Sequence, residues 1–222
     1  MDKCTLAIVT TVLLLIGGAA APASAAGQAV KLHEHVTSQG ETVQIPYITY
    51  AAFAAAAVGG KALSSKSSGE KATLGDLVTV SPLDEVTRLL GEPEDLSQGT
   101  DPWGTVRGYL EYKGMRMEYI KTSGSSSFRL REMRLRTPDW SLTVNGVKLR
   151  PGGEADRLSS AVRQTMRMSG SASDVAEGYI YIAKPGIARN EKVKFFGEST
   201  FIGIEVDQGT DTIKQVRFHR LL

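Results

Sequence analysis

The sequence predicts an α+β protein in which two tandem units, each a helix followed by an antiparallel meander, share one sheet behind an N-terminal extension. The first observation is an internal repeat: residues 108–112 read Gly-Tyr-Leu-Glu-Tyr, and residues 178–182 read Gly-Tyr-Ile-Tyr-Ile. The second is that helical and strand patterns follow in the same order around both copies, which is typical of α+β architecture. The flanking blocks also match: Pro82 and Glu85 correspond to Pro151 and Glu154, and residues 130–136 correspond to 213–219.

Residues 1–25 have the pattern of a secretory signal peptide. Lys3 provides a positive start, residues 6–16 form an apolar stretch, and Ala23-Ser24-Ala25 is a small-residue cleavage site. An uncleaved membrane anchor is the alternative, because apolar and small residues run on for about 20 positions. The pattern favours cleavage after Ala25, and therefore export to the periplasm or the cell exterior.

The composition narrows the classes of function. The chain of 222 residues has one cysteine, Cys4, and a formal net charge of +2. Since Cys4 opens the apolar stretch rather than closing it, a lipoprotein is disfavoured and the mature chain has no disulfide. The nearly neutral charge argues against a nucleic-acid partner, which usually requires a strong basic excess.

Residues 26–73 are predicted to form the N-terminal extension and a linker. Alternating side chains over residues 30–36 and 42–45 predict a hairpin that has no partner strand. The Ala-rich residues 47–58 predict a helix on the main domain, ended by the glycine pair that follows. Membrane or partner contact through this segment is an alternative hypothesis.

The stretch 64–70 is rich in serine and lysine, which is typical of a flexible linker, so we place the domain boundary there. Before it, His33 and His35 are spaced to lie on one strand face. Two ligands do not complete a zinc site, which needs three or four. We therefore expect two solvent-facing histidines and no metal.

The first unit covers about residues 74–137 and begins with a helix over 81–93. Ser81 is the expected N-cap, Pro82 the first helical residue, and Gly91 the end. Its expected buried positions are Leu83, Val86, Leu89 and Leu90. Three strands with short connections, and therefore antiparallel pairing, are expected at residues 105–112, 115–121 and 128–136.

The second unit covers about residues 140–222. Alternation around Asn145-Gly146 predicts a tight hairpin over residues 140–149. A longer helix is expected over residues 154–168, with its apolar face toward the sheet. Four strands are expected after it, at residues 178–183, 192–196, 200–207 and 213–220, one more than the first unit has.

The period of two along each strand separates the faces of the predicted sheet. The apolar positions Leu110, Tyr112, Met133 and Leu135, and their repeats Ile180, Ile182, Val216 and Phe218, are expected to face the helices. Tyrosine and arginine gather on the opposite face, and both are enriched at protein interfaces, although they also form good cross-strand pairs. The candidate partner-binding residues are Tyr109, Glu111, Arg134, Arg136, Tyr179, Tyr181 and Arg217.

The order of a helix, Leu-Leu-Gly-Glu-Pro at residues 89–93 and an aromatic meander, repeated in outline, resembles the beta-lactamase inhibitor proteins. The single unit is also similar to the SmpA/OmlA family of outer-membrane assembly lipoproteins. The likeness covers residues 74–222. It implies binding of a secreted enzyme across an aromatic-rich sheet, here the face that carries Tyr109 and Tyr179.

The sequence thus predicts an exported, non-enzymatic protein-binding or inhibitor-like module, with an unidentified partner in the envelope or outside the cell. A structural or assembly accessory protein of the envelope is the alternative. A hydrolase is disfavoured, because no nucleophile elbow, phosphate-binding glycine loop or metal-ligand spacing is present. His219 with Glu205 is the nearest arrangement to a base and its orienting acid. No cofactor is expected.

Overall fold

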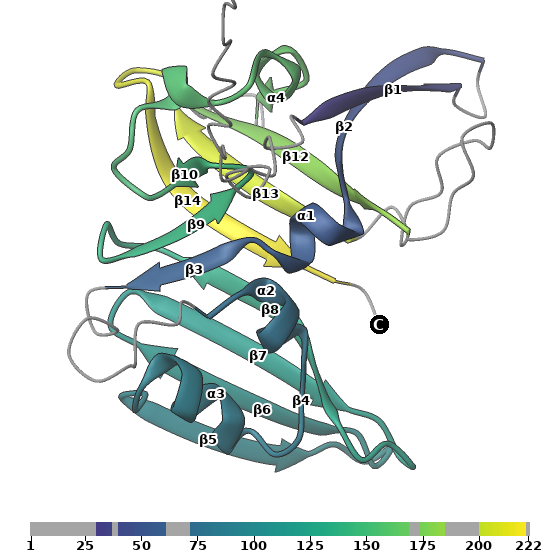
Figure 1. The fold of residues 1–222 in the computed structure, drawn as a ribbon, viewed down its shortest axis with the longest axis vertical. Helices are drawn as coiled ribbons and strands as arrows, with labels where there is room; N and C mark the ends of the chain where they lie inside the picture. The colour runs from purple at the N-terminus through teal and green to yellow at the C-terminus, as the bar shows by residue number, and fades with distance from the viewer. Residues whose placement is uncertain (1–29, 37–39, 61–71, 169–173, 185–199, 221–222) are drawn as a thin grey trace, which may run out of the picture.

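The fold is α+β, with most residues in the strands of a large mixed sheet and a few short helices (Figure 1). The computed structural model describes residues 30–36, 40–60, 72–168, 174–184 and 200–220. The predicted signal peptide, the linker at 64–70 and the strand at 192–196 lie outside the described residues.

The large sheet runs in the order β1-β2-β12-β13-β14-β8-β7-β6-β5, with β11 beside β12 and β4 beside β8. Neighbours are antiparallel except for β2 and β12, which are parallel. The strands are β1 (Lys31–Val36), β2 (Thr42–Thr49), β4 (Thr79–Val80), β5 (Asp95–Thr100), β6 (Val106–Tyr112), β7 (Met115–Lys121), β8 (Phe128–Leu135), β11 (Arg167–Met168), β12 (Val175–Ala183), β13 (Phe201–Asp207) and β14 (Thr212–His219).

The predicted N-terminal hairpin is confirmed, but the expectation that it lacks a partner strand is wrong. β2 continues past the hairpin and pairs with β12, so that Ile48 lies opposite Ile182. Both isoleucines are buried, at 2% and 0% exposure. Burial of these side chains stabilises the long-range pairing, which the local alternation does not reveal.

The helix expected over residues 47–58 is wrong. Thr49 caps a helix of five residues, α1 (Tyr50–Ala54), and the chain then enters β3 (Ala57–Gly60). β3 pairs with β9 (Trp140–Val144), which also pairs with β10 (Val147–Leu149), in a second sheet of three strands. A Cβ on Gly60 would lie 2.6 Å from the Trp140 ring. Gly60 therefore leaves room for the Trp140 ring, and the glycine pair belongs to a strand instead of ending a helix.

The first unit's helix begins later than expected. After α2 (Leu74–Val78), α3 covers Asp84–Leu90 and ends at Gly91, whose φ is 84°. Ser81 does not cap it, because the Ser81 hydroxyl donates to the carbonyl of Ser126. Its buried face is confirmed, with Leu83, Val86 and Leu90 at 0% exposure and Leu89 packed beside them.

The long second helix expected over residues 154–168 is also wrong in extent. A 3-10 turn, η2 (Ala155–Arg157), is followed by α4 (Ser160–Gln164) and then by β11. Leu158 is extended between them, with ψ at 144°, and the Ser159 side chain accepts from the backbone N–H of Val162. This serine cap starts a new helix in place of continuing the turn.

The remaining strand predictions that fall on described residues are confirmed, including the hairpin at Asn145-Gly146, where both φ angles are positive. Besides β3 and β11, which replace parts of expected helices, the strands β4 and β5 were not predicted, and β5 is the longer of these two. All of its side chains are exposed, so it carries no apolar alternation. It joins the sheet as an edge strand through its backbone.

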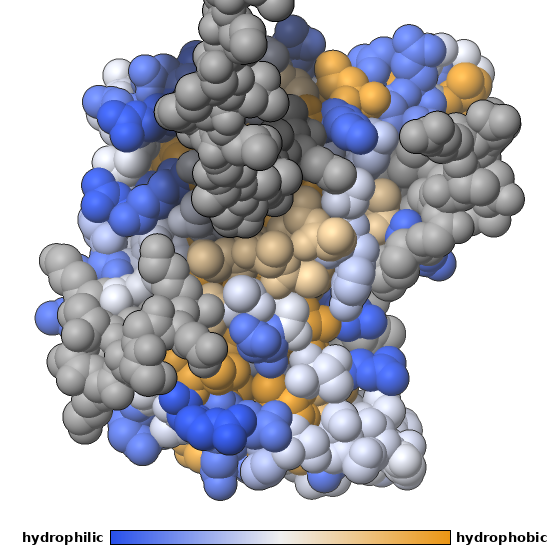
Figure 2. All heavy atoms as spheres, viewed as in Figure 1, coloured by the Kyte–Doolittle hydropathy of each residue, from blue (hydrophilic) through white to orange (hydrophobic). Residues whose placement is uncertain are grey.

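The helices lie on one face of the large sheet, and the hydrophobic core lies between the helices and that face (Figure 1). Phe53 of α1 contacts Phe218, and Leu83 before α3 packs on Gly108. The predicted separation of the two strand faces is confirmed: the eight apolar positions are at most 5% exposed. On the helix side, Figure 2 shows a pale orange, moderately apolar band over α1 and β3.

Candidate functional site: the open face of the sheet

The side chains on the large sheet opposite the helices form what we call the open face. Six of the predicted residues lie on this face, as expected from their alternation with buried residues, but they are half-buried rather than fully exposed: Tyr109, Glu111, Arg134, Tyr179, Tyr181 and Arg217. Arg136 directly follows β8 and is exposed. None of the described helices covers this face, because all of them pack on the other side. The open face is therefore a candidate surface for a partner.

One group on the open face centres on Phe201. Its ring lies 4.9 Å from Tyr179, 6.2 Å from Tyr181 and 5.5 Å from His219, measured between ring centroids. The guanidinium of Arg217 lies 5.6 Å above the Phe201 ring. Strand register explains the gathering, because Tyr181, Phe201 and His219 are direct partners across β12, β13 and β14. These five residues are called the Phe201 cluster below.

A glycine shapes the centre of this cluster. Gly203 lies between Tyr179 and Arg217 in the register of β12, β13 and β14. A Cβ on Gly203 would lie 3.4 Å from the Phe201 ring and 3.6 Å from Nε of Arg217. The missing side chain thus leaves room for the ring and the guanidinium. Nε of Arg217 is buried there and has no hydrogen-bond partner in the part of the chain that the structure describes.

Beside the cluster, three arginines lie next to one another across the strands. Arg217 on β14 is paired in register with Arg134 on β8, and Arg134 with Arg116 on β7. This set is called the arginine row. Nε of Arg134 lies 2.6 Å from Oε1 of Glu132, and Nε of Arg116 lies 3.1 Å from Oε1 of Glu111. Like charges placed opposite one another destabilise a sheet, so the row concentrates positive charge at a cost to stability.

Two arginines predicted for the site, Arg136 and Arg217, have no carboxylate within ion-pair distance among the described residues. In contrast, Glu118 farther along the open face binds two arginines through Oε1, at 2.9 Å to Arg107 and 3.1 Å to Arg131. The β6–β8 side of the face is thus largely neutralised within the protein. Of the predicted site residues, Arg217 and Arg136 are the cations that no carboxylate among the described residues neutralises.

Burial and neighbouring charges set the ionisation of the Phe201 cluster. Burial raises the pKa of Tyr179 to about 12, aided by the hydrogen bond that its hydroxyl donates to Glu177. Burial lowers the pKa of His219 below its ordinary value of 6.5, and Arg217 acts in the same direction although Glu132 opposes it. At neutral pH the cluster therefore presents uncharged rings around the single cation of Arg217.

The open face does not assemble the base and orienting acid considered for catalysis. Oε1 of Glu205 accepts from Nε2 of Gln215 at 2.8 Å, while His219 lies opposite Phe201 and Glu132. Within the described ranges, no group of three or more His, Cys, Asp or Glu residues is placed to hold a metal ion. No helix among those residues is long and apolar enough to cross a membrane.

Sequence reasoning missed part of the open face. Arg116 and Glu118 were detectable, because residues 115–119 read Met-Arg-Met-Glu-Tyr and alternate cleanly. Tyr47, which lies opposite Tyr181 and extends the aromatic residues onto β2, was hidden by the wrong helix prediction. The site therefore covers more strands than the repeat alone indicated.

Comparison with protein-family models, with curated proteins and with solved structures finds no match to this chain.

Proposed function

We propose that this chain is an exported, non-enzymatic protein-binding module, inhibitor-like in its mode of action, that holds its partner on the open face. The observation that carries the proposal is the contact between the Phe201 cluster and the arginine row. Tyrosine and arginine supply most hot-spot energy at protein interfaces. Arg217 places a cation without a carboxylate partner in the described residues among these rings.

The chemistry of the face indicates the partner. Carboxylates on the partner would form ion pairs with Arg217 and Arg136. Apolar or aromatic side chains of the partner would pack on Phe201 and Tyr181. The partner surface is therefore acidic with an apolar centre. The resemblance to the inhibitor proteins suggests that this surface belongs to a secreted enzyme.

We also propose that the sheet joins two tandem units, at about residues 74–137 and 140–222. The repeat aligns Arg134 with Arg217, and these two residues are paired with each other where β8 meets β14. The repeat also aligns Arg131 with Lys214. Arg131 is the residue of β8 left unpaired at its register shift with β7, and Lys214 is the residue of β14 left unpaired at its register shift with β13. Such a pairing about one central position is what two joined copies would produce.

A duplicated unit would explain the width of the face. Stable protein interfaces bury about 800 Å² on each partner, more than a three-stranded meander offers on one side. Two meanders joined at β8 and β14 give a continuous face with the arginine row at the junction. The proposed function thus depends on both units being present.

Site-specific photo-crosslinking tests this function. A benzoylphenylalanine placed at Tyr181 or at Tyr109 should crosslink one acidic partner in the native envelope or culture medium. The same group at Lys148, exposed on β10 in the smaller sheet, is the matched control. The crosslink should weaken in Arg217→Gln and at high salt. A product of equal yield from Lys148, or one insensitive to Arg217→Gln, would contradict the proposal.

A second candidate function, an accessory role in envelope assembly, is supported by the apolar band over α1 and β3 (Figure 2). Ala51 and Ala55 are exposed in this band. Co-sedimentation with phospholipid vesicles tests it, because Ala51→Glu together with Ala55→Glu should abolish association if the band contacts lipid. Unchanged association of this variant, or no association of the unmodified protein, would exclude membrane contact through residues 47–58.

A further inference from the structure

A pocket of about 520 Å³ lies at the point where β14 ends, and its lining includes the buried residues Phe53 and Phe218 on the helix side of the sheet. The last register pair of β14 with β8 is His219 with Glu132, followed by a hydrogen bond from the N–H of Arg220 to the carbonyl of Arg131, and β8 then pairs with β4 at Arg129 and Phe128. The pocket occupies the junction between these two partner strands. It is lined by Tyr50, Phe53, Val78, Thr79, Gly124, Ser125, Ser126, Ser127, Arg129, Ile182, Thr200, Phe218 and Arg220.

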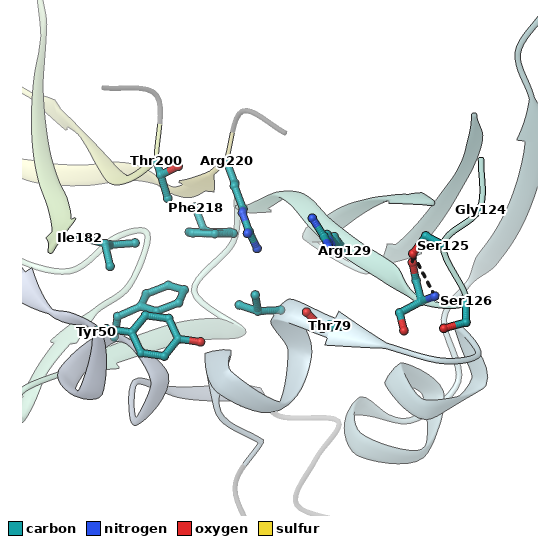
Figure 3. Close-up of a pocket in the computed structure, with 13 residues that line it drawn as sticks. Tyr50, Thr79, Gly124, Ser125, Ser126, Arg129, Ile182, Thr200, Phe218 and Arg220 are labelled. Atoms are coloured by element: carbon teal, nitrogen blue, oxygen red, sulfur yellow. Dashed lines mark hydrogen bonds between the residues drawn. The ribbon is translucent and has the colours of Figure 1, made fainter. Parts of the chain in front are cut away.

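Two arginines share this pocket. Figure 3 shows Arg220 projecting into it from the end of β14, with Arg129 of β8 beside it. Among the residues that the structure describes, neither guanidinium has a carboxylate within ion-pair distance. Burial lowers the pKa of Arg220, and the neighbouring charge of Arg129 lowers it further. Both groups still carry their charge at neutral pH, because arginine does not deprotonate in proteins.

The rest of the wall is mainly hydroxyl groups. Figure 3 shows Ser125 and Ser126 on one side of the pocket, Tyr50 on the other and Thr79 between them, and Ser127 also lines it. The apolar side chains behind them are almost completely buried, with Phe53 at 3% and Phe218 at 1% exposure. A ligand would therefore meet cations and hydroxyl groups, and little apolar surface.

We propose that this pocket binds a small hydroxylated anion, namely a sugar that carries a phosphate or a carboxylate. The pair formed by Arg129 and Arg220 would bind the anionic group, because guanidinium groups match phosphate and carboxylate oxygens with two parallel hydrogen bonds. The serine and threonine hydroxyls would exchange hydrogen bonds with the sugar hydroxyls, except that Ser125, whose hydroxyl donates to the carbonyl of Ser127, could only accept. The volume falls within the range of small-molecule sites, about 300–1,000 Å³. This site is independent of the open face.

Isothermal titration calorimetry of the purified full chain tests the inference with glucose 6-phosphate, inorganic phosphate and glucose as probes. Glucose 6-phosphate should bind most tightly, phosphate more weakly, and glucose not measurably. Arg129→Gln and Arg220→Gln should each weaken glucose 6-phosphate binding about tenfold or more, since each removes charge-assisted hydrogen bonds. Arg150→Gln, at an exposed arginine outside the pocket, is the control and should bind like the unmodified chain.

Thermal unfolding shows whether the Arg129→Gln and Arg220→Gln variants remain folded, so that a loss of binding can be distinguished from a loss of structure. Removing one of two neighbouring cations relieves repulsion, so both variants should melt at the same or a higher temperature than the unmodified chain without ligand. Saturable binding that both variants retain would overturn the assignment of the anion to these arginines. Equal affinity for phosphate and glucose 6-phosphate would overturn the role of the hydroxyl groups, and absence of binding by all three probes would overturn the site.

Discussion

Gly108, in the first copy of the repeated motif, should not tolerate a side chain. A Cβ at this position would lie 2.4 Å from Cδ1 of Leu83, which directly precedes α3 and is fully buried, so the Leu83 side chain would have to shift within the core. Overpacking of this kind costs about 1–3 kcal/mol. Replacing glycine by alanine in a strand returns about 0.4–1 kcal/mol through the unfolded chain. Gly108→Ala should therefore destabilise the protein by about 1–2 kcal/mol, measured by urea unfolding, and lower Tm by about 3–6 °C.

Two other glycines provide comparison variants for this prediction, because a Cβ at each would meet fewer or more distant atoms. A Cβ added to Gly99 on the neighbouring strand β5 would meet no atom within 4 Å, so Gly99→Ala should change stability by less than about 0.5 kcal/mol. At Gly178, the repeat of Gly108, a Cβ would lie 3.0 Å from Met166 and 3.1 Å from Val162, so Gly178→Ala should give an intermediate loss. If Gly108→Ala is as stable as Gly99→Ala, α3 does not pack on β6 as described.

Three further outcomes are expected. Tyr119→Phe should cost about 1–3 kcal/mol in urea unfolding, because the buried Tyr119 hydroxyl donates to the carbonyl of Leu77 at 2.9 Å and its loss leaves that carbonyl unpaired. Since burial lowers the pKa of His219, protonation favours the unfolded chain: stability should be full above pH 6.5 and fall as the pH drops through the folded pKa, a slope that His219→Gln reduces. Glu118→Gln should cost about 1–2 kcal/mol, because two arginines lose their shared carboxylate; an unchanged Tm would refute this.

The sequence predicted the two faces of the central strands because burial and alternation are local properties and the repeat checks one copy against the other. Leu110 and Ile180 are buried as expected, and Tyr109 and Tyr179 lie on the opposite face as expected, although they are half-buried there. The Asn145-Gly146 turn was equally readable, since its positive φ angles favour these residues. The assignment of these residues to the two faces of the sheet follows from such local rules.

The features that the sequence did not predict depend on contacts between segments far apart in the chain. An Ala-rich stretch reads as a helix, yet residues 57–60 pair with β9 because Gly60 accommodates Trp140. The parallel pairing of β2 with β12 likewise joins segments far apart in the chain. Arg129 and Arg220 meet only because β14 ends where β4 begins to pair with β8. No short-range pattern in the sequence indicates these contacts.

On the proposed function, Arg136 and Arg217 serve a partner and contribute little to folding. The most direct test measures urea unfolding and crosslinking from Tyr181 on one variant, Arg136→Gln with Arg217→Gln. Neither arginine has a carboxylate partner in the described residues, so unfolding should change by less than about 0.5 kcal/mol or shift toward greater stability. Crosslinking should fall at least tenfold. Crosslinking that persists, or a loss of several kcal/mol in stability, would contradict the account.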